Sequence, residues 1–246
     1  SLSTENVEDM AVRLWSSADK YAGRELCSIL NESIRNDAHA VAFAEAPSAG
    51  ADCQVEDTVR LRPAVTLTCI IQHHLNMTRR GGSTHHTQWP EGPDAPVGKG
   101  RSSQRDATFR GAELPDAHKG FFEALARAHA SDPAQGVYRV PMLLATSFSK
   151  RVVNDIFLPR IGADKPKVMF TVKLDGDLGC KQVNYLDKSE SPDEAEFLYS
   201  AYSVFRVASV TWSETPEKTA TPHQVTILAS PDNKEEPEDV PTAPWH

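Results

Sequence analysis

Hydrophobic and polar positions follow two different rhythms along this chain of 246 residues. Over residues 4–45, and again over residues 58–77, apolar side chains recur at steps of three and four, which is the spacing of one helix face. The apolar positions of the first stretch are Met10, Leu14, Leu26, Ile29, Leu30 and Ile34. The sequence therefore predicts that the N-terminal part of the protein is helical.

From residue 106 onward the pattern changes to short apolar runs that are rich in β-branched and aromatic residues, which is typical of strands. The expected strands span residues 107–110, 138–147, 168–174, 204–212 and 224–229, and helices are expected at 120–129 and 150–158. Helices followed by a mostly antiparallel β core predict an α+β fold.

The organisation that follows is a single domain over residues 1–230, with a helical part at about 1–80 and a β core at 106–230. The loop 79–105 between them is rich in Gly, Pro, His, Ser and Thr, and loops of this length are usually functional or disordered. Residues 231–246 carry five acidic residues and four prolines, so a flexible acidic tail is expected.

The net charge of the chain limits the kinds of molecule that it is expected to bind. The chain has 26 basic and 34 acidic residues, which gives a net charge of −8. Such a chain repels nucleic acid and lacks a long basic stripe, so no nucleic-acid partner is expected. No apolar stretch is long enough for a membrane span. A small molecule or a protein is the expected partner, and the acidic balance favours a basic, arginine-bearing surface.

The sequence gives only weak signals for a metal site, for disulfides and for the cellular compartment. The cysteines have no CxxC spacing, and the disulfide state of Cys27, Cys53, Cys69 and Cys180 stays open. Paired histidines flank the long loop without a fixed ligand geometry, so no metal is expected. The first residues, SLSTENVEDM, hold no signal peptide and are typical of a trimmed N-terminus, so secreted and cytoplasmic locations both remain possible.

Candidate chemistry begins with Glu194 and Glu196, which open the apolar run EAEFLYSAYSVFRVASVTW. In isolation a Glu-x-Glu pair is usually a solvated face. At the entrance to a strand, however, a rigid scaffold aims both carboxylates, and residues i and i+2 of an extended chain point the same way. The pair is therefore expected to converge on one ligand.

Two upstream segments strengthen this hypothesis. In the first, Arg110 is followed by Gly111. The planar fork of arginine suits phosphate, and glycine lets a ligand approach the backbone closely. In the second, an apolar strand ends in the hydroxyl-bearing residues Thr146 and Ser147.

In this order the three segments resemble the arginine–serine–glutamate class of mono-ADP-ribosyltransferases, which includes cholera-toxin-like and ecto-ADP-ribosyltransferase-like proteins. Members show a strand ending in Arg-Gly, a Ser-Thr-Ser strand, and a Glu-x-Glu loop running into a strand. The spacings suit, at 37 residues from Arg110 to Ser147 and 49 from Ser147 to Glu196. The phrase LNESIR at 30–35 resembles the Leu-Asn-x-x-Leu-Arg of an N-terminal helix in many relatives. The resemblance covers about residues 20–212 and implies N-terminal helices packed on a mostly antiparallel two-sheet β core.

The resemblance also implies an activity: cleavage of NAD between nicotinamide and ribose, and transfer of ADP-ribose to an arginine of a protein acceptor. Arg110 would hold the diphosphate or its adjoining ribose, and Gly111 would keep the backbone clear for the nicotinamide amide. Glu196 would bind the ribose 2′-hydroxyl and offset the positive charge that grows on the ring. Glu194 would meet the arginine acceptor. NAD is then a substrate, and no metal is needed.

The resemblance also implies roles for residues in and near the triplet Ala145-Thr146-Ser147, which aligns with the family's Ser-Thr-Ser. Thr146 or Ser147 would orient Glu196, and Phe148 or Phe157 would pack on the nicotinamide. The family's catalytic serine is commonly the first of its triplet, where this chain has Ala145. Either Thr146 or Ser147 supplies the hydroxyl, or the alignment shifts by a residue or two, or the site is weakened. Two alternative functions stay open: a NAD glycohydrolase with water as acceptor, and a non-catalytic module that binds NAD or protein.

Overall fold

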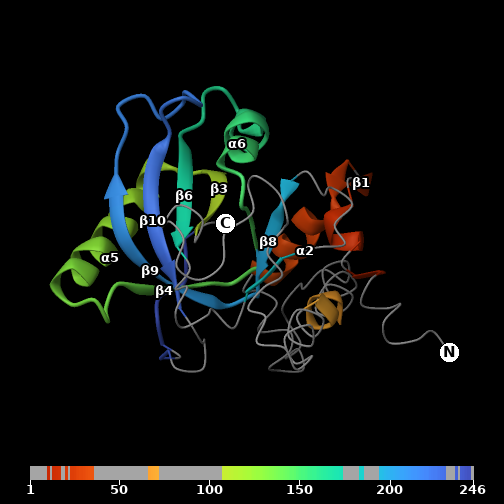
Figure 1. The fold of residues 1–246 in the computed structure, drawn as a ribbon, viewed down its shortest axis with the longest axis horizontal. Coiled ribbons are helices and arrows are strands. Elements are labelled where there is room, and N and C mark those ends of the chain that lie inside the picture. The colour runs from red at the N-terminus through yellow and green to blue at the C-terminus, as the bar shows by residue number, and fades with distance from the viewer. Residues whose placement is uncertain are drawn as a thin grey trace, which may run out of the picture.

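The computed structural model describes residues 10, 11, 13–17, 20, 21, 23–35, 66–71, 107–173, 183–185, 194–230, 236, 237 and 239–244. An eight-stranded sheet dominates the fold, with the strand order β4-β9-β10-β6-β3-β5-β8-β7 (Figure 1). Its strands are β3 (Ala107–Glu113), β4 (Val137–Val140), β5 (Leu144–Ser147), β6 (Lys167–Lys173), β7 (Val183–Tyr185), β8 (Glu196–Tyr199), β9 (Ser203–Thr211) and β10 (His223–Ala229). Only β6 and β10 pair in parallel, which confirms the predicted mostly antiparallel α+β fold.

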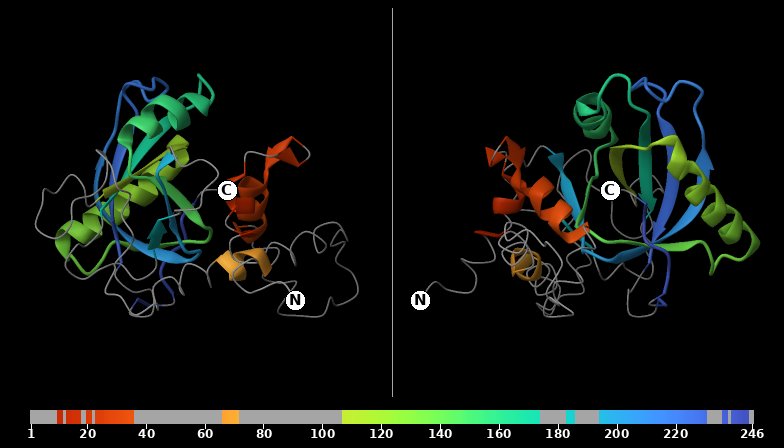
Figure 2. Two further views of the ribbon diagram at one scale, coloured as in Figure 1. Left: turned by 45° about the vertical axis from the view of Figure 1, so that its right-hand side comes forward. Right: turned by 180° about the vertical axis from the view of Figure 1, so that it is seen from behind.

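Helices lie at both ends of this sheet. They are α2 (Leu26–Arg35), α5 (Lys119–Ser131) after a 3-10 turn η1 (Asp116–His118), and one continuous helix made of α6 (Lys150–Val152), a π-helical turn η2 (Val153–Phe157) and α7 (Leu158–Arg160). Figure 2 shows α2 and the helical residues 66–71 together on the β8 side, opposite α5. Among the described helices, none has the length and apolar character needed to cross a membrane.

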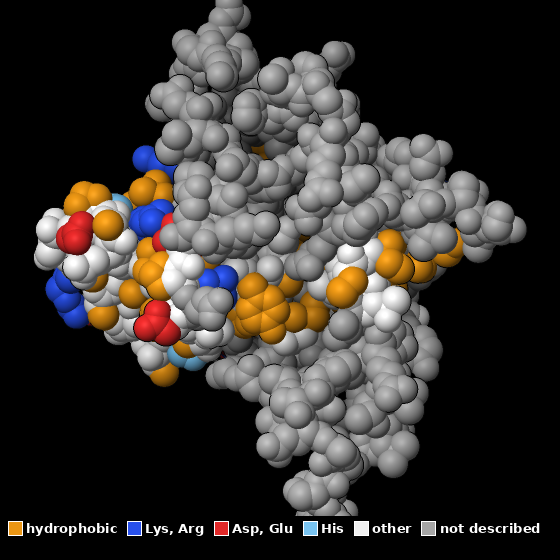
Figure 3. Space-filling model, turned by 90° about the horizontal axis from the view of Figure 1, so that it is seen from below, with side chains coloured by type: hydrophobic (Ala, Val, Ile, Leu, Met, Phe, Trp, Pro, Cys, Tyr) orange, Lys and Arg blue, Asp and Glu red, His pale blue; other side chains and the backbone are white. Residues whose placement is uncertain are grey.

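On the face seen in Figure 3, charged side chains of the described residues lie at the end that carries α5, mixed with apolar ones, and apolar side chains continue across the middle. The buried side of α5 explains its position, because the Phe122 ring packs against the rings of Tyr138 and Phe170 at centroid distances of 5.9 and 5.7 Å. These aromatic contacts join the helix to the sheet core.

A narrow joint divides the sheet into five strands and three. β3 pairs with β6 along its whole length, whereas it pairs with β5 through the single residue pair Phe109 and Ser147. Side chains of both parts meet in one core cluster, in which Tyr199 of β8 packs on Phe205 of β9 with ring centroids 5.2 Å apart. The strands nevertheless form one continuous order, so the expected division into two sheets is not confirmed.

The N-terminal segment departs from the predicted continuous helices. A hairpin of β1 (Lys20–Tyr21) and β2 (Arg24–Glu25) interrupts it, and Gly23 has a φ of +81°, which an L side chain rarely adopts. Met10 and Leu14 of the predicted apolar stripe are exposed, at 41% and 42%. The helical residues 10, 11 and 13–16 bury Ala11 and Trp15 instead, so the predicted face was wrong by one residue.

One predicted strand is divided by a turn, and the apolar run after Glu194 contains a further strand before the predicted one at 204–212, which β9 matches. The expected strand 138–147 splits into β4 and β5 at Pro141, which has no N–H to donate to a ladder. The run that starts at Glu196 splits into β8 and β9 at residues 200–202, where Tyr202 has a φ of +62°. The ends of β5 and β8 are thereby fixed next to each other.

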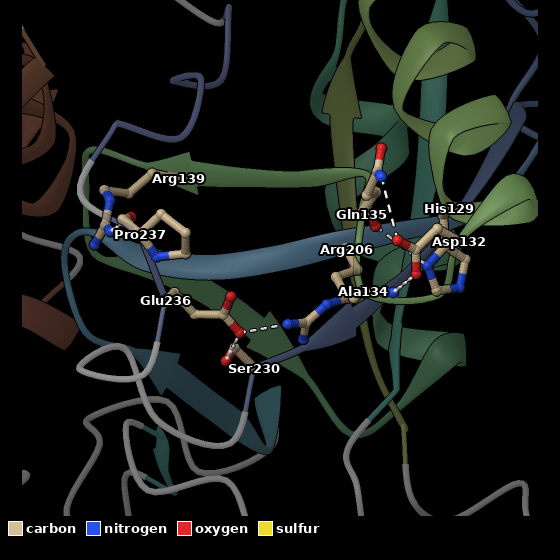
Figure 4. Close-up of polar contacts among 9 residues, drawn as sticks. All are labelled: His129, Asp132, Ala134, Gln135, Arg139, Arg206, Ser230, Glu236 and Pro237. Atoms are coloured by element: carbon tan, nitrogen blue, oxygen red, sulfur yellow. Dashed lines mark hydrogen bonds and ion pairs between the residues drawn. The ribbon is translucent and has the colours of Figure 1, made fainter.

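The turn after α5 is closed by its own side chains (Figure 4). The Asp132 carboxylate accepts hydrogen bonds from the Ala134 backbone N–H at 3.0 Å and from Gln135 Nε2 at 3.2 Å. Gly136, with a φ of +75°, then turns the chain into β4. This turn positions the outermost strand of the sheet.

The described tail residues pack along that strand. Figure 4 shows Arg206 Nη2 and Ser230 Oγ at Glu236, each donating to Oε1 at 2.6 Å. Arg139 Nη2 donates to the Pro237 carbonyl at 2.8 Å, and Ala243 is buried in the main core cluster. The predicted flexible tail stays a prediction beyond these contacts, and the loop 79–105 lies outside the described residues.

We predict that Glu236→Ala lowers the free energy of unfolding by about 1–3 kcal/mol, because it leaves the Arg206 guanidinium and the Ser230 hydroxyl without their acceptor. Urea denaturation measures the change. The control is Glu113→Ala, which removes an exposed ion pair with Lys165 and should cost about 0.5 kcal/mol or less. Equal losses in the two variants would show that the tail contact adds nothing to stability.

Candidate active site

A cleft of about 480 Å³ lies between the N-terminal elements and the joint of the sheet, within the usual size range of ligand pockets. Six of the predicted site residues line it: Arg110, Gly111, Thr146, Phe157, Glu194 and Glu196. Two others do not. Ser147 is buried beneath the cleft, and Phe148 packs in the core against Phe197, with ring centroids 4.9 Å apart.

The two glutamates reach the cleft through a turn. Ala195 between them has a φ of +46°, in the left-handed region, so the pair does not sit on an extended chain as predicted. The end of β5 holds this turn, because Ser147 Oγ donates to the Glu194 carbonyl at 2.6 Å and the Phe148 N–H donates to the Ala195 carbonyl at 3.1 Å. Both side chains therefore face one cavity from a fixed backbone.

The hydroxyl groups of Thr146 and Ser147 hydrogen-bond to the backbone of the segment that carries Glu194 and Glu196. Thr146 Oγ1 donates to the Phe197 carbonyl at 2.8 Å, and Ser147 Oγ also accepts from the Ser149 N–H at 3.0 Å. In the part of the chain that the structure describes, neither hydroxyl bonds to the Glu196 carboxylate. Both residues fix where the Glu-x-Glu segment runs.

The Glu196 carboxylate has a different partner. Trp15, from the N-terminal helix, donates its Nε1–H to Glu196 Oε1 at 2.9 Å, and its own side chain is buried. Burial raises the pKa of Glu196 to about 7, the indole N–H opposes this rise, Glu194 adds to it and Arg110 opposes it. Glu196 consequently changes its charge near neutral pH.

Other charged groups surround the pair. The pKa of Glu194 is raised, chiefly by burial, with Arg160 of α7 lowering it and Glu25 of β2 raising it further. The pKa of the Cys27 thiol is raised to about 11 by burial first, then by Glu25 and Glu196, so the thiol stays protonated at neutral pH. The cleft thus combines carboxylates with two guanidinium groups, those of Arg110 and Arg160.

The backbone of β3 and the helix above it are in close contact. Arg110 Nη1 donates to the Ala145 carbonyl at 2.8 Å, which directs the guanidinium across the joint toward β5. A Cβ at Gly111 would lie 2.8 Å from Leu158 Cδ2 and 3.1 Å from Val153 Cγ1. Glycine is therefore needed so that the helix of η2 and α7 can approach, and this helix brings Phe157 and Arg160 to the cleft.

Asn31, the second residue of the LNESIR phrase, attaches α2 to the sheet. Its Nδ2 donates to the Leu143 carbonyl at 3.0 Å, and its Oδ1 accepts from the Leu143 N–H at 3.1 Å. Asn31 also lines the cleft. This pair of bonds places one wall of the cavity.

Sequence reasoning missed Trp15, Glu25 and Arg160. Trp15 lies one residue after the predicted core position Leu14, outside the predicted helix face, and Glu25 falls within a stretch that was predicted to be helical. Arg160 lies just past the predicted end of the helix at 158. Its place three residues after Phe157, on the same helix face, is the one signal that would have linked it to the site.

No group of three or more His, Cys, Asp or Glu side chains arranged to hold a metal ion occurs among the described residues.

Comparisons with known proteins identify the fold. No protein-family model and no curated protein matches the sequence. Among solved structures, the Vis toxin, an ADP-ribosyltransferase from Vibrio splendidus, matches with a TM-score of 0.55 and 13% identity over 96% of this chain and 77% of that one. Plx2a, an ADP-ribosyltransferase toxin from Paenibacillus larvae, matches with a TM-score of 0.47 and 12% identity over 91% of this chain and 85% of that one. The first match shows that this chain has the ADP-ribosyltransferase fold.

We predict that Glu196→Gln stabilises the protein at high pH. Because the folded pKa of about 7 lies above the reference value of 4.5, the stability linked to Glu196 is fully present below pH 4.5 and is lost as pH rises through 7. Relative to wild type, the variant should gain about 1–3 kcal/mol between pH 5 and pH 8.5 in urea denaturation. A difference between the two proteins that does not change with pH would contradict this assignment.

Proposed function

We propose that this chain is a NAD-dependent mono-ADP-ribosyltransferase that modifies arginine on a protein acceptor. The observation that carries the proposal is that Arg110, Glu194 and Glu196 line one cleft in a chain with the ADP-ribosyltransferase fold. Within that cleft the cationic and anionic groups are suited to different parts of the two substrates.

Arg110 is the residue proposed to hold NAD. A guanidinium binds phosphate oxygens through charge-assisted hydrogen bonds, and the contact with the Ala145 carbonyl keeps this one aimed into the cleft. The Phe157 ring offers an aromatic surface to the nicotinamide. Thr146 and Ser147 contribute by fixing the backbone of the Glu-x-Glu segment, and Gly111 by admitting the helix that carries Phe157.

Glu196 is proposed to act on the bond between nicotinamide and ribose. When the glycosidic C–N bond breaks, its electron pair leaves with nicotinamide, and positive charge builds up on the ribose ring as in glycoside hydrolysis. A carboxylate that accepts a hydrogen bond from the ribose 2′-hydroxyl offsets this charge, and does so strongly where water is excluded. The burial that raises the pKa of Glu196 is evidence for such an environment.

Glu194 is proposed to meet the acceptor. A carboxylate binds a guanidinium in a bidentate fashion, and a carboxylate with a raised pKa is a better base for the proton that the attacking nitrogen loses. The new bond joins that nitrogen to the ribose anomeric carbon. Glu25, on the same cleft, adds negative charge that favours a cationic acceptor.

We predict that Glu196→Gln lowers the turnover of NAD by about 10²–10⁴-fold, the range for a positioned acid or base. NAD affinity, measured by calorimetry, should be largely kept, because the amide has nearly the same shape. An unchanged rate in a NAD-cleavage assay would refute the role given to Glu196.

We predict that Glu194→Gln abolishes transfer to arginine while hydrolysis of NAD continues, because water needs no carboxylate to recognise it. Labelled NAD with a mixture of arginine-bearing acceptors measures both products. Loss of both activities would make Glu194 a structural residue. Wild-type protein that releases ADP-ribose without labelling any arginine would be a NAD glycohydrolase, and wild-type protein that binds no NAD would be a non-catalytic module.

A further inference from the structure

We propose, on the basis of the function above, that Trp15 is the positioning residue of Glu196, and that its indole N–H takes the place of a hydroxyl from strand β5. The side chain donates to Glu196 Oε1 at 2.9 Å from a helix 181 residues away in the sequence. Since one oxygen is held in this way, Oε2 is the oxygen left to meet the ribose.

Strand β5 offers no hydroxyl to this carboxylate. Ser147 is the register partner of Glu196, but its hydroxyl donates to the Glu194 carbonyl and accepts from the Ser149 N–H. Ala145 is the register partner of Leu198, two residues beyond Glu196, so it lies diagonally across from Glu196 on the same face. Its methyl group provides no hydrogen-bond donor.

The surroundings of Trp15 suit this role. Its side chain is 3% exposed and packs in the cluster that joins the N-terminal helices to Leu143 and Leu198 of the sheet. An indole N–H is a donor only, so it favours the ionised carboxylate and cannot turn to accept from the acid form. The same ring therefore fixes the direction of Glu196 and favours its ionised form.

Removal of this N–H has a predictable electrostatic effect. The indole N–H lowers the pKa of Glu196, against the burial that raises it. The other titratable or charged groups that share the cleft are Arg110 on β3, Glu194 before β8, Glu25 on β2, Cys27 on α2 and Arg160 on α7. A variant that loses the N–H but keeps these groups should need a higher pH to ionise Glu196.

The first test is Trp15→Phe, which keeps an aromatic ring and removes the donor. At pH 7 we expect kcat for NAD cleavage to fall about 10–100-fold, the effect of a hydrogen bond to a charged group. KM for NAD should change much less, and the acid limb of the pH profile should move up by about one pH unit or more. Addition of Ala145→Ser should restore part of the rate, because it places a hydroxyl diagonal to Glu196.

The matched control is Trp212→Phe. Trp212 Nε1 donates to Glu123 Oε1 at 2.7 Å, a bond of the same type between residues that do not line the cleft. We expect this variant to lose about as much stability as Trp15→Phe and to keep the wild-type acid limb of the pH profile. If the two variants have the same pH profile, Trp15 only supports the fold and the proposal is overturned.

A second measurement needs neither activity nor a tryptophan variant that folds. The chain has four tryptophans, so their indole ¹H–¹⁵N signals can be followed by NMR during a pH titration. In wild-type protein one indole signal should shift with a midpoint near pH 7, and in Glu196→Gln it should not. Absence of such a signal would overturn the role of Trp15 even if NAD is cleaved, and its presence in a protein that cleaves no NAD would refute the proposed function alone.

Discussion

The cleft depends on one constraint, which is that the N-terminal helices stay docked on the short strands β5 and β8. Two hydrogen bonds between the Asn31 side chain and the Leu143 backbone provide the polar part of this attachment. The cluster around Trp15, Leu30 and Ile71 provides the apolar part. Without this docking, Glu196 would face water, and both its burial and its indole partner would be lost.

Docking places like charges together in a site with little water, and this is costly. Burial is the largest cause of the raised pKa of both residues; Glu194 further raises the pKa of Glu196, and Glu25 that of Glu194. Arg110 lowers the pKa of Glu196 and Arg160 that of Glu194, which offsets some of that cost. The proposed ligand, a dinucleotide with two phosphates and a cationic ring, also has charges of both signs, which is why we propose it for this cleft.

The sequence predicted the β core and the charged residues that line the cleft better than it predicted the geometry of either. Arg110, Glu194 and Glu196 follow from short motifs at strand ends, because alternating burial makes strands visible. The left-handed backbone at Ala195 is held by hydrogen bonds from Ser147 and Phe148, which no local pattern encodes. Trp15 was missed because the predicted helix face carried Met10 and Leu14, and only the tertiary fold decides that a carboxylate lies beside Trp15.

The π-helical turn η2 gives the helix above the cleft one residue more per turn than an α-helix has. Loss of a single residue within Val153–Phe157 would return this turn to α-helical bonding and remove the local widening of the helix just before Phe157 and Arg160 enter the cleft. Under the proposed function, the π-helical turn would therefore help to determine the charge that an incoming acceptor meets.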